Sequence, residues 1–199
     1  MNTTNKPSTR GRPRRFDPDA AVAQAQHLFH EKGYDGVSVA DLTQVLGINP
    51  PSFYAAFGSK AELYRKVLER YALTGALPLR QILEADQPLA VALVQLLEQA
   101  ARSYAADPQA TGCLVLEGTH CDDPQARAAA QLYHLAAQEF IRSSIAARYP
   151  QEAQLLADFV TTTMAGLSAS ARHGQSLERL LASARLAGLA VTQALSSEA

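Results

Sequence analysis

The sequence predicts an all-α protein. Apolar residues recur every three or four positions along most of the chain, which is the spacing of one face of a helix. Alanine, the best helix former, is abundant, and no window shows the apolar–polar alternation of a half-buried strand. The 199 residues are 47% hydrophobic and 19% charged, which permits a large core and excludes a wholly disordered chain. This length fits one domain, or two small ones that share a core.

The N-terminal third is expected to begin with two helices that have clear start and stop signals. Asp17 followed by Pro18 is typical of a helix start, and Gly33 ends the helix that it opens. Ser38 caps the next, shorter helix, with Asp41 in the acceptor place of a capping box. The residues expected to face inward from this shorter helix are Val39, Leu42, Val45 and Leu46.

Two more helices follow, one short and one longer. In the short helix, Phe53 and Phe57 lie four positions apart and are expected to face the core, whereas Tyr54 lies off their face. The signals that start and stop these helices are Asn49 with Pro50 and Pro51, then Gly58, then the capping box of Ser59 and Glu62.

The remaining chain is expected to form five helices bounded by Pro, Gly and polar capping residues. Their expected ranges are about 88–105, 113–120, 124–148, 151–172 and 176–195, with ends that are good to a few residues.

Charge is distributed unevenly along the chain, although the net charge is only −1. Residues 1–15 contain five Lys and Arg and no acidic residue, which predicts a flexible basic arm. Residues 1–77 carry a net charge of +3 and residues 78–199 a net charge of −4. A basic head on an acidic body suggests that only the head meets a polyanion.

The compartment is expected to be the cytoplasm. Two cysteines cannot build a disulfide scaffold, and the N-terminus is polar, without the apolar core of a signal peptide. The longest uncharged stretch, residues 42–59, contains two Pro and two Gly and does not suit a membrane span. No membrane association is therefore expected.

Residues 38–57 pair two short helices around a tight turn at Gly47. Such a pair is typical of the helix-turn-helix, whose second helix enters the major groove of DNA, a groove about 12 Å wide. Ser52 and Tyr54 carry hydroxyls suited to a phosphate or a base edge, and Lys60 adds a charge at the next helix start.

Residues 12–71 resemble the DNA-binding domain of the TetR family of bacterial transcriptional regulators. The Tyr-x-x-Phe-x-Ser-Lys-x-x-Leu element beginning at Tyr54 carries the likeness most specifically, together with Leu28-Phe29, Gly33-Tyr34, the segment 38–42 and Gly47-Ile48. The resemblance implies that the DNA contacts include Ser38, Pro51, Ser52, Tyr54, Lys60 and, on the groove side, Ala55 and Ala56.

The resemblance also implies an organisation and a function. The expected parts are the arm 1–15, a DNA-binding domain 16–71 and a helical effector-binding and dimerisation domain 72–199. The expected protein is a homodimeric repressor that binds a double-stranded DNA operator of two-fold symmetry, with heads about 34 Å apart. A small-molecule effector would release it from that operator.

The recognition helix departs from a common pattern, because it offers no Arg, Lys, Gln or Asn for a bidentate base contact. Direct readout is therefore expected to use short contacts, such as alanine methyls against thymine methyls. Arg12, Arg14 and Arg15 would supply a second contact, either in an A·T-rich minor groove or on backbone phosphates without preference.

The last two helices are rich in small residues and leucine, which suits half of a four-helix bundle completed by a second copy. A buried hairpin within one chain would show the same pattern. The residues expected at the dimer interface are Phe159, Met164, Leu167, Leu177, Leu180, Leu181, Ala184 and Gly188.

Between these helices and the head, apolar residues mix with a few polar ones, as in ligand pockets. Each of them could equally be ordinary core. The candidate effector-pocket residues are Tyr104, Cys113, Leu116, His120, Tyr133, His134 and Phe140.

Cys113 offers an alternative mechanism. Gly112-Cys113-Leu114 resembles an element of some TetR-like proteins that sense electrophiles or oxidants, and a helix N-terminus would stabilise its thiolate. A small buried residue is the simpler interpretation. On one continuous helix, Cys113 and Cys121 would lie about 12 Å apart, too far for a disulfide.

Other functions find little support. The cluster at residues 120–123 has metal-ligand residue types, but they are adjacent rather than spaced to converge, so no metal or cofactor is expected. No phosphate loop, paired carboxylates or complete nucleophile elbow suggests an enzyme. A helical adaptor that does not bind DNA remains the other alternative.

Overall fold

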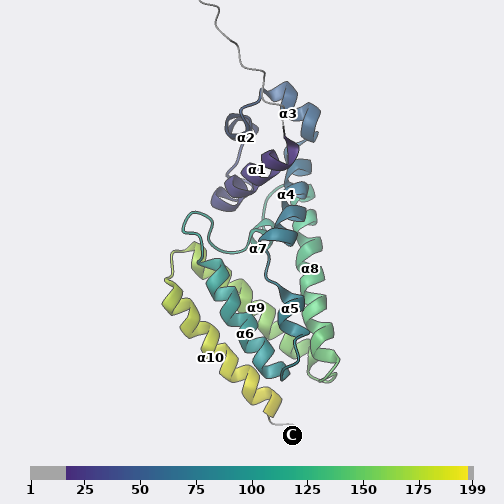
Figure 1. Cartoon of the computed structure of the whole chain (residues 1–199), viewed down its shortest axis with the longest axis vertical. Coiled ribbons are helices and arrows are strands. Elements are labelled where there is room, and N and C mark those ends of the chain that lie inside the picture. Colours follow the sequence, from purple (N-terminus) through teal and green to yellow (C-terminus); the bar gives the residue numbers. More distant parts are fainter. Residues whose placement is uncertain (1–16, 197–199) are drawn as a thin grey trace, which may run out of the picture.

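The computed structural model describes residues 17–196, and within them it contains ten α-helices and no strand (Figure 1). The prediction of an all-α fold is confirmed. The helices are α1 (Pro18–Lys32), α2 (Val39–Leu46), α3 (Pro50–Phe57), α4 (Lys60–Thr74), α5 (Leu79–Leu83), α6 (Leu89–Tyr104), α7 (Leu114–Gly118), α8 (Pro124–Ala146), α9 (Ala153–Arg172) and α10 (Leu177–Ser196).

Helices α1 to α4 form the head of the molecule, and their ends follow the capping signals. The Asp17 carboxylate accepts from the first N–H groups of α1, and Ser38 and Asp41 make the reciprocal capping box of α2. Gly47 adopts φ 64° between α2 and α3, a left-handed conformation that costs glycine little. The Asn49 side chain accepts from Ser52 N at the start of α3.

The inward face of α2 differs from the prediction at two positions. Val45 is exposed, and Thr43 is buried, with its hydroxyl donating to Ala40 O at 2.9 Å. That internal bond satisfies the hydroxyl and lets threonine face the core. Leu42 is buried as expected, whereas Val39 and Leu46 are half-buried.

The body of the molecule is organised around α6, which lies between α9 and α10 (Figure 1). Helices α6 and α10 approach closely at Gly188 of α10. A Cβ added at this position would lie 3.0 Å from a methyl group of Val94 in α6. Four of the residues expected at a dimer interface are buried within the single chain. They are Leu167, Leu180, Ala184 and Gly188.

The head and the body share packing through α7 and the start of α8. The core of the head includes Leu114, Cys121, Ala126 and Ala130, which lie far along the chain from α1 to α4. This core is therefore not confined to the first 71 residues. Gly118 ends α7 directly against α4 and α8.

Gly118→Ala is expected to lower the free energy of unfolding by about 1–2 kcal/mol, because overpacking forces neighbouring groups to move. A Cβ at Gly118 would overlap the Tyr64 hydroxyl and would lie 2.8 Å from Ala130 Cβ. Urea unfolding followed by circular dichroism measures the loss. Tyr64→Phe removes the overlapping oxygen, so the double variant is expected to lose less than the two single losses together. Strict additivity would contradict this account.

Within residues 17–196, no helix combines the length and the apolar character that a membrane span requires. Residues 17–196 also contain no group of three or more His, Cys, Asp and Glu placed to hold a metal ion.

Candidate nucleic-acid interface and ligand cavity

Helix α3 presents a small exposed face. Phe53 and Phe57 are buried in the head, as expected, and hold the helix against the rest of the bundle. Tyr54 is 52% exposed and its ring stands edge-on to that of Phe53, with ring centroids 5.4 Å apart. The exposed residues of α3 include all five that were expected to contact DNA from this helix: Pro51, Ser52, Tyr54, Ala55 and Ala56.

The face of α3 is compact and carries no formal charge. Pro50 and Pro51 remove two N–H groups from the helix start, and Ser52 N already donates to Asn49 Oδ1 at 2.9 Å. The free polar groups on this face are therefore hydroxyls. Such a surface can approach the edges of bases closely, with methyl groups from Ala55 and Ala56 in contact.

Ser38 is engaged within the chain. Its hydroxyl donates to Asp41 Oδ2 at 2.6 Å and accepts from Asp41 N at 3.1 Å. These bonds, with that from Ser38 N, hold the pKa of the Asp41 carboxyl below its usual value. Ser38 therefore fixes the start of α2, and a phosphate would have to share a hydroxyl that already has partners.

Lys60 is engaged in a similar way. Its Nζ donates to Tyr34 O at 2.9 Å and Val37 O at 2.8 Å, and it lies 3.9 Å from the centre of the Tyr34 ring. Two of its three donors thus hold the loop between α1 and α2, which leaves one for a phosphate. Tyr34 extends the network to the start of α8, because its hydroxyl donates to Asp123 Oδ2 at 2.9 Å.

The predicted arm residues Arg12, Arg14 and Arg15 lie outside the described residues. Their DNA contacts stay a prediction from the sequence.

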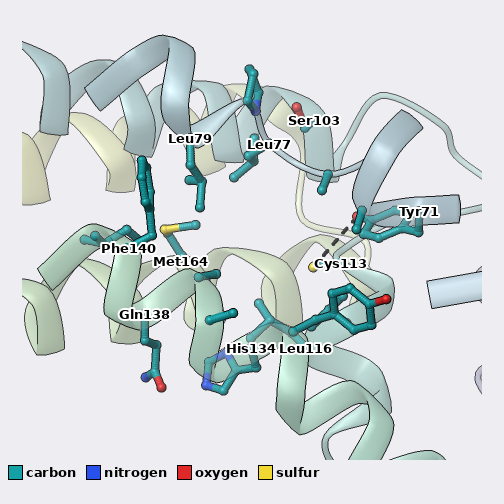
Figure 2. Close-up of a pocket in the computed structure, with 18 of the residues that line it drawn as sticks. Tyr71, Leu77, Leu79, Ser103, Cys113, Leu116, His134, Gln138, Phe140 and Met164 are labelled. Carbon is teal, nitrogen blue, oxygen red and sulfur yellow. Dashed lines mark hydrogen bonds between the residues drawn. The ribbon is translucent and has the colours of Figure 1, made fainter. Parts of the chain in front are cut away.

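A cavity of about 760 Å³ opens in the body between the end of α4, the α4–α5 segment and helices α6 to α9 (Figure 2). This volume lies in the usual range for a small-molecule site. His120 is exposed and does not line the cavity. The six other candidate residues do: Tyr104, Cys113, Leu116, Tyr133, His134 and Phe140.

The sequence did not identify the wall formed by the segment between α4 and α6. Figure 2 shows Leu77 and Leu79 facing Phe140 and Met164 across one end of the cavity. The segment holds the five-residue helix α5, which is too short to show a helical repeat. Met164, which was expected at a dimer interface, lines this cavity.

The other end of the cavity contains Tyr71 and Cys113 (Figure 2). Tyr104 also lines the cavity. Tyr71 Oη donates to Cys113 Sγ at 3.8 Å. Burial raises the pKa of all three side chains. For Cys113 this is the opposite of the stabilised thiolate that its place before α7 predicted, because desolvation outweighs the nearby backbone N–H groups.

The segment before α7 joins the cavity to the head. Cys113 N donates to Ser168 Oγ of α9 at 2.9 Å, and Gly112 O lies 3.2 Å from His30 Nε2 of α1. Arg172 of α9 donates to His30 O at 3.0 Å and to Thr111 O at 3.2 Å, and its Nε lies 3.1 Å from Glu117 Oε2. Cys113 in the cavity wall is therefore the direct neighbour of Gly112, whose carbonyl contacts His30 of α1.

Helices α9 and α10 expose apolar side chains on their outer faces. Leu155 is 72% exposed, and Leu186 and Leu189 are 70% and 68% exposed. Phe159 and Leu177, both expected at the interface, are partly exposed, whereas Leu181 packs partly against the core. These faces are available to a second copy of the chain.

Comparisons with known proteins agree with this geometry. Residues 21–67 match the family model described as bacterial regulatory proteins, tetR family. The chain is 52% identical over 191 residues to the HTH-type transcriptional repressor BdcR of Escherichia coli K12, covering 96% of this chain and 97% of BdcR. It is 29% identical to the repressor ComR of the same organism, over 87% of this chain and 88% of ComR.

A solved structure shows a similar fold. A cysteine mutant of the TetR family transcriptional regulator CifR, complexed with 26-base-pair operator DNA, superposes with a TM-score of 0.79. The two chains are 33% identical, and the match covers 90% of this chain and 99% of the CifR chain.

Proposed function

Because the chain belongs to the TetR family of bacterial regulatory proteins, we propose that it is a transcriptional repressor released from its operator by a small molecule. Two copies bind a double-stranded site of two-fold symmetry, and the protein acts in the cytoplasm, where that DNA is. The observation that carries the proposal is the face of α3, where every residue not needed for the core is small or hydroxyl-bearing and exposed.

Operator recognition uses this face in the major groove. Tyr54 donates its exposed hydroxyl to a phosphate, Ser52 reaches a phosphate or a base edge, and Ala55 and Ala56 contact thymine methyls. Lys60 holds the loop before α2, and Ser38 fixes the start of α2, through hydrogen bonds within the head. CifR, a relative of similar fold, binds double-stranded operator DNA.

Release follows from the path of α4. This helix starts at Lys60, next to the end of α3, and its last turns place Tyr71 in the cavity wall. A ligand that displaces Tyr71 moves one end of the 15-residue helix α4, whose other end adjoins α3. The ligand then favours a spacing of the two heads that does not fit the operator, and the population shifts away from DNA.

The proposal is tested by selecting bound fragments from a random duplex library and measuring affinity for the selected site. Tyr54→Ala is expected to weaken binding about tenfold, because one phosphate hydrogen bond is worth about 1.5 kcal/mol. Tyr54→Phe keeps the ring but removes the hydroxyl, and it is expected to lose nearly as much affinity for the selected site. Leu73→Ala is the control, since Leu73 is exposed on α4 outside this face. A folded dimer that selects no site would favour the adaptor instead.

A further inference from the structure

The hydroxyl of Tyr104 is a buried polar group in the cavity wall. Tyr104 is 3% exposed and lines the cavity, and its hydroxyl makes no hydrogen bond within the described residues 17–196. Burial raises the pKa of Tyr104, and Cys113 and Tyr71, which line the same cavity, raise it further. Buried tyrosine hydroxyls usually have a hydrogen-bond partner, and this O–H group is therefore a donor available to a bound molecule.

The rest of the wall provides no charge that would hold an ionic ligand. Asp, Glu and Lys are absent from the residues lining this cavity in the described part of the chain. Arg80, the guanidinium at the wall, pairs with Glu84 and lies 5.1 Å from the Phe140 ring. Burial and the neighbouring His120 lower the pKa of His134, which is therefore neutral at pH 7. A charged ligand would lose its hydration here without gaining a free counter-charge.

We propose that the cavity binds a neutral, largely apolar carbonyl compound, whose oxygen accepts a hydrogen bond from the Tyr104 hydroxyl. The apolar body of the ligand packs between Phe140, Leu79 and Met164 at the other end (Figure 2). The inference rests on the proposed function, because it names the chemical class of the effector that the repressor would sense.

The polar end of the cavity suits a carbonyl group rather than an acid. Tyr71, Tyr104 and Cys113 are all kept protonated by burial, so they offer donors and no negative charge. The Tyr71 hydroxyl donates to Cys113 Sγ at 3.8 Å, which is a weak hydrogen bond. A carbonyl oxygen of the ligand could replace this sulfur as the acceptor. A hydrocarbon of the same shape would leave the Tyr104 donor unpaired in an apolar site.

Three probes of matched shape test the proposal by isothermal titration calorimetry on the full chain. These are 4-acetylbiphenyl, a ketone; 4-isopropenylbiphenyl, in which CH₂ replaces the oxygen; and biphenyl-4-carboxylate. The ketone is expected to bind about tenfold more tightly than the alkene, and the carboxylate more weakly than both. An alkene that binds as tightly as the ketone, or a carboxylate that binds best, would overturn the proposal.

Two tyrosine variants locate the donor. Tyr104→Phe is expected to weaken binding of the ketone about tenfold and to leave the affinity for the alkene unchanged. Tyr133→Phe is the matched control, because Tyr133 lines the same cavity but is only half-buried, whereas Tyr104 is buried. The ketone-to-alkene ratio is expected to stay unchanged in Tyr133→Phe. A fall in that ratio as large as the one in Tyr104→Phe would overturn the assignment to Tyr104.

Operator affinity without any probe separates this inference from the proposed function. A protein that binds its selected DNA site but does not discriminate among the probes contradicts the ligand class alone. A protein that discriminates among the probes but selects no DNA contradicts the repressor proposal and leaves the cavity assignment intact.

Discussion

Replacing both Leu186 and Leu189 by lysine is expected to convert the dimer to a monomer and to weaken operator binding at least about 100-fold. Both leucines lie on the outer face of α10 and are about two-thirds exposed in a single chain. Burying two leucines of this kind in a partner contributes several kcal/mol, at about 25 cal/mol per Å² of apolar surface. Two ammonium groups in the same place would have to be buried without partners.

The loss of DNA affinity follows from the loss of the second head. Once one head is bound, the second binds at a high effective concentration, and such linkage is worth about 10²–10⁴ in affinity. Lysine is chosen because it adds positive charge, which by itself favours DNA. A fall in affinity can then not be assigned to electrostatic repulsion.

Light scattering coupled to size exclusion measures the oligomeric state, and fluorescence anisotropy measures operator affinity at fixed salt. Leu132→Lys is the control, because Leu132 on α8 is 69% exposed but lies on neither α9 nor α10. It is expected to leave both quantities unchanged. A double variant that stays dimeric and binds normally would place the interface elsewhere.

The helices with strong caps could be predicted from the sequence, because their signals are local. Ser38 with Asp41, and Pro124 after Asp123, each start a helix where expected. Helix α5 was missed, since five residues after Pro78 form one turn and a half and show no repeat. Its position depends on packing against α6 and α8 rather than on its own sequence.

The candidate sites were predictable only in part, for a related physical reason. A repeat of small residues identifies a close helix contact but not which helix is the partner. Gly188 of α10 packs on Val94 of the same chain, whereas Leu186 and Leu189 of α10 are exposed. Likewise, the sequence placed Cys113 before a helix start but could not show that the site is desolvated, which decides the direction of its pKa.

Arg172→Met is expected to lower the free energy of unfolding by about 2–3 kcal/mol, because the variant leaves the hydrogen-bond acceptors of Arg172 without a donor. The Arg172 guanidinium donates hydrogen bonds to the backbone carbonyls of His30 and Thr111, and it forms an ion pair with the Glu117 carboxylate. These acceptors come from α1, the segment before α7 and α7 itself. The variant therefore removes the link that fastens the head to α9, while methionine keeps most of the side-chain volume.

Arg185→Met provides a matched control for burial. Arg185 Nε lies 3.1 Å from Glu98 Oε1, the same separation as Arg172 Nε from Glu117 Oε2, but the Arg185 side chain is 62% exposed against 20% for Arg172. An exposed pair is worth about 0–1 kcal/mol, so this variant is expected to lose little. Urea unfolding measures both. Equal losses would show that the junction at Arg172 does not hold the head.

A second measurement identifies the site of the effect. Burial is the largest cause that lowers the pKa of His30, and the positive charge of Arg172 lowers it further. Arg172→Met is therefore expected to raise the pKa of His30, which the pH titration of its ring proton signals in NMR spectra reports. Arg185→Met leaves this junction intact and is expected to leave that titration where it is. An unchanged His30 titration in Arg172→Met would mean that α1 and α9 are not coupled through this contact, and that ligand signals reach α3 by α4 alone.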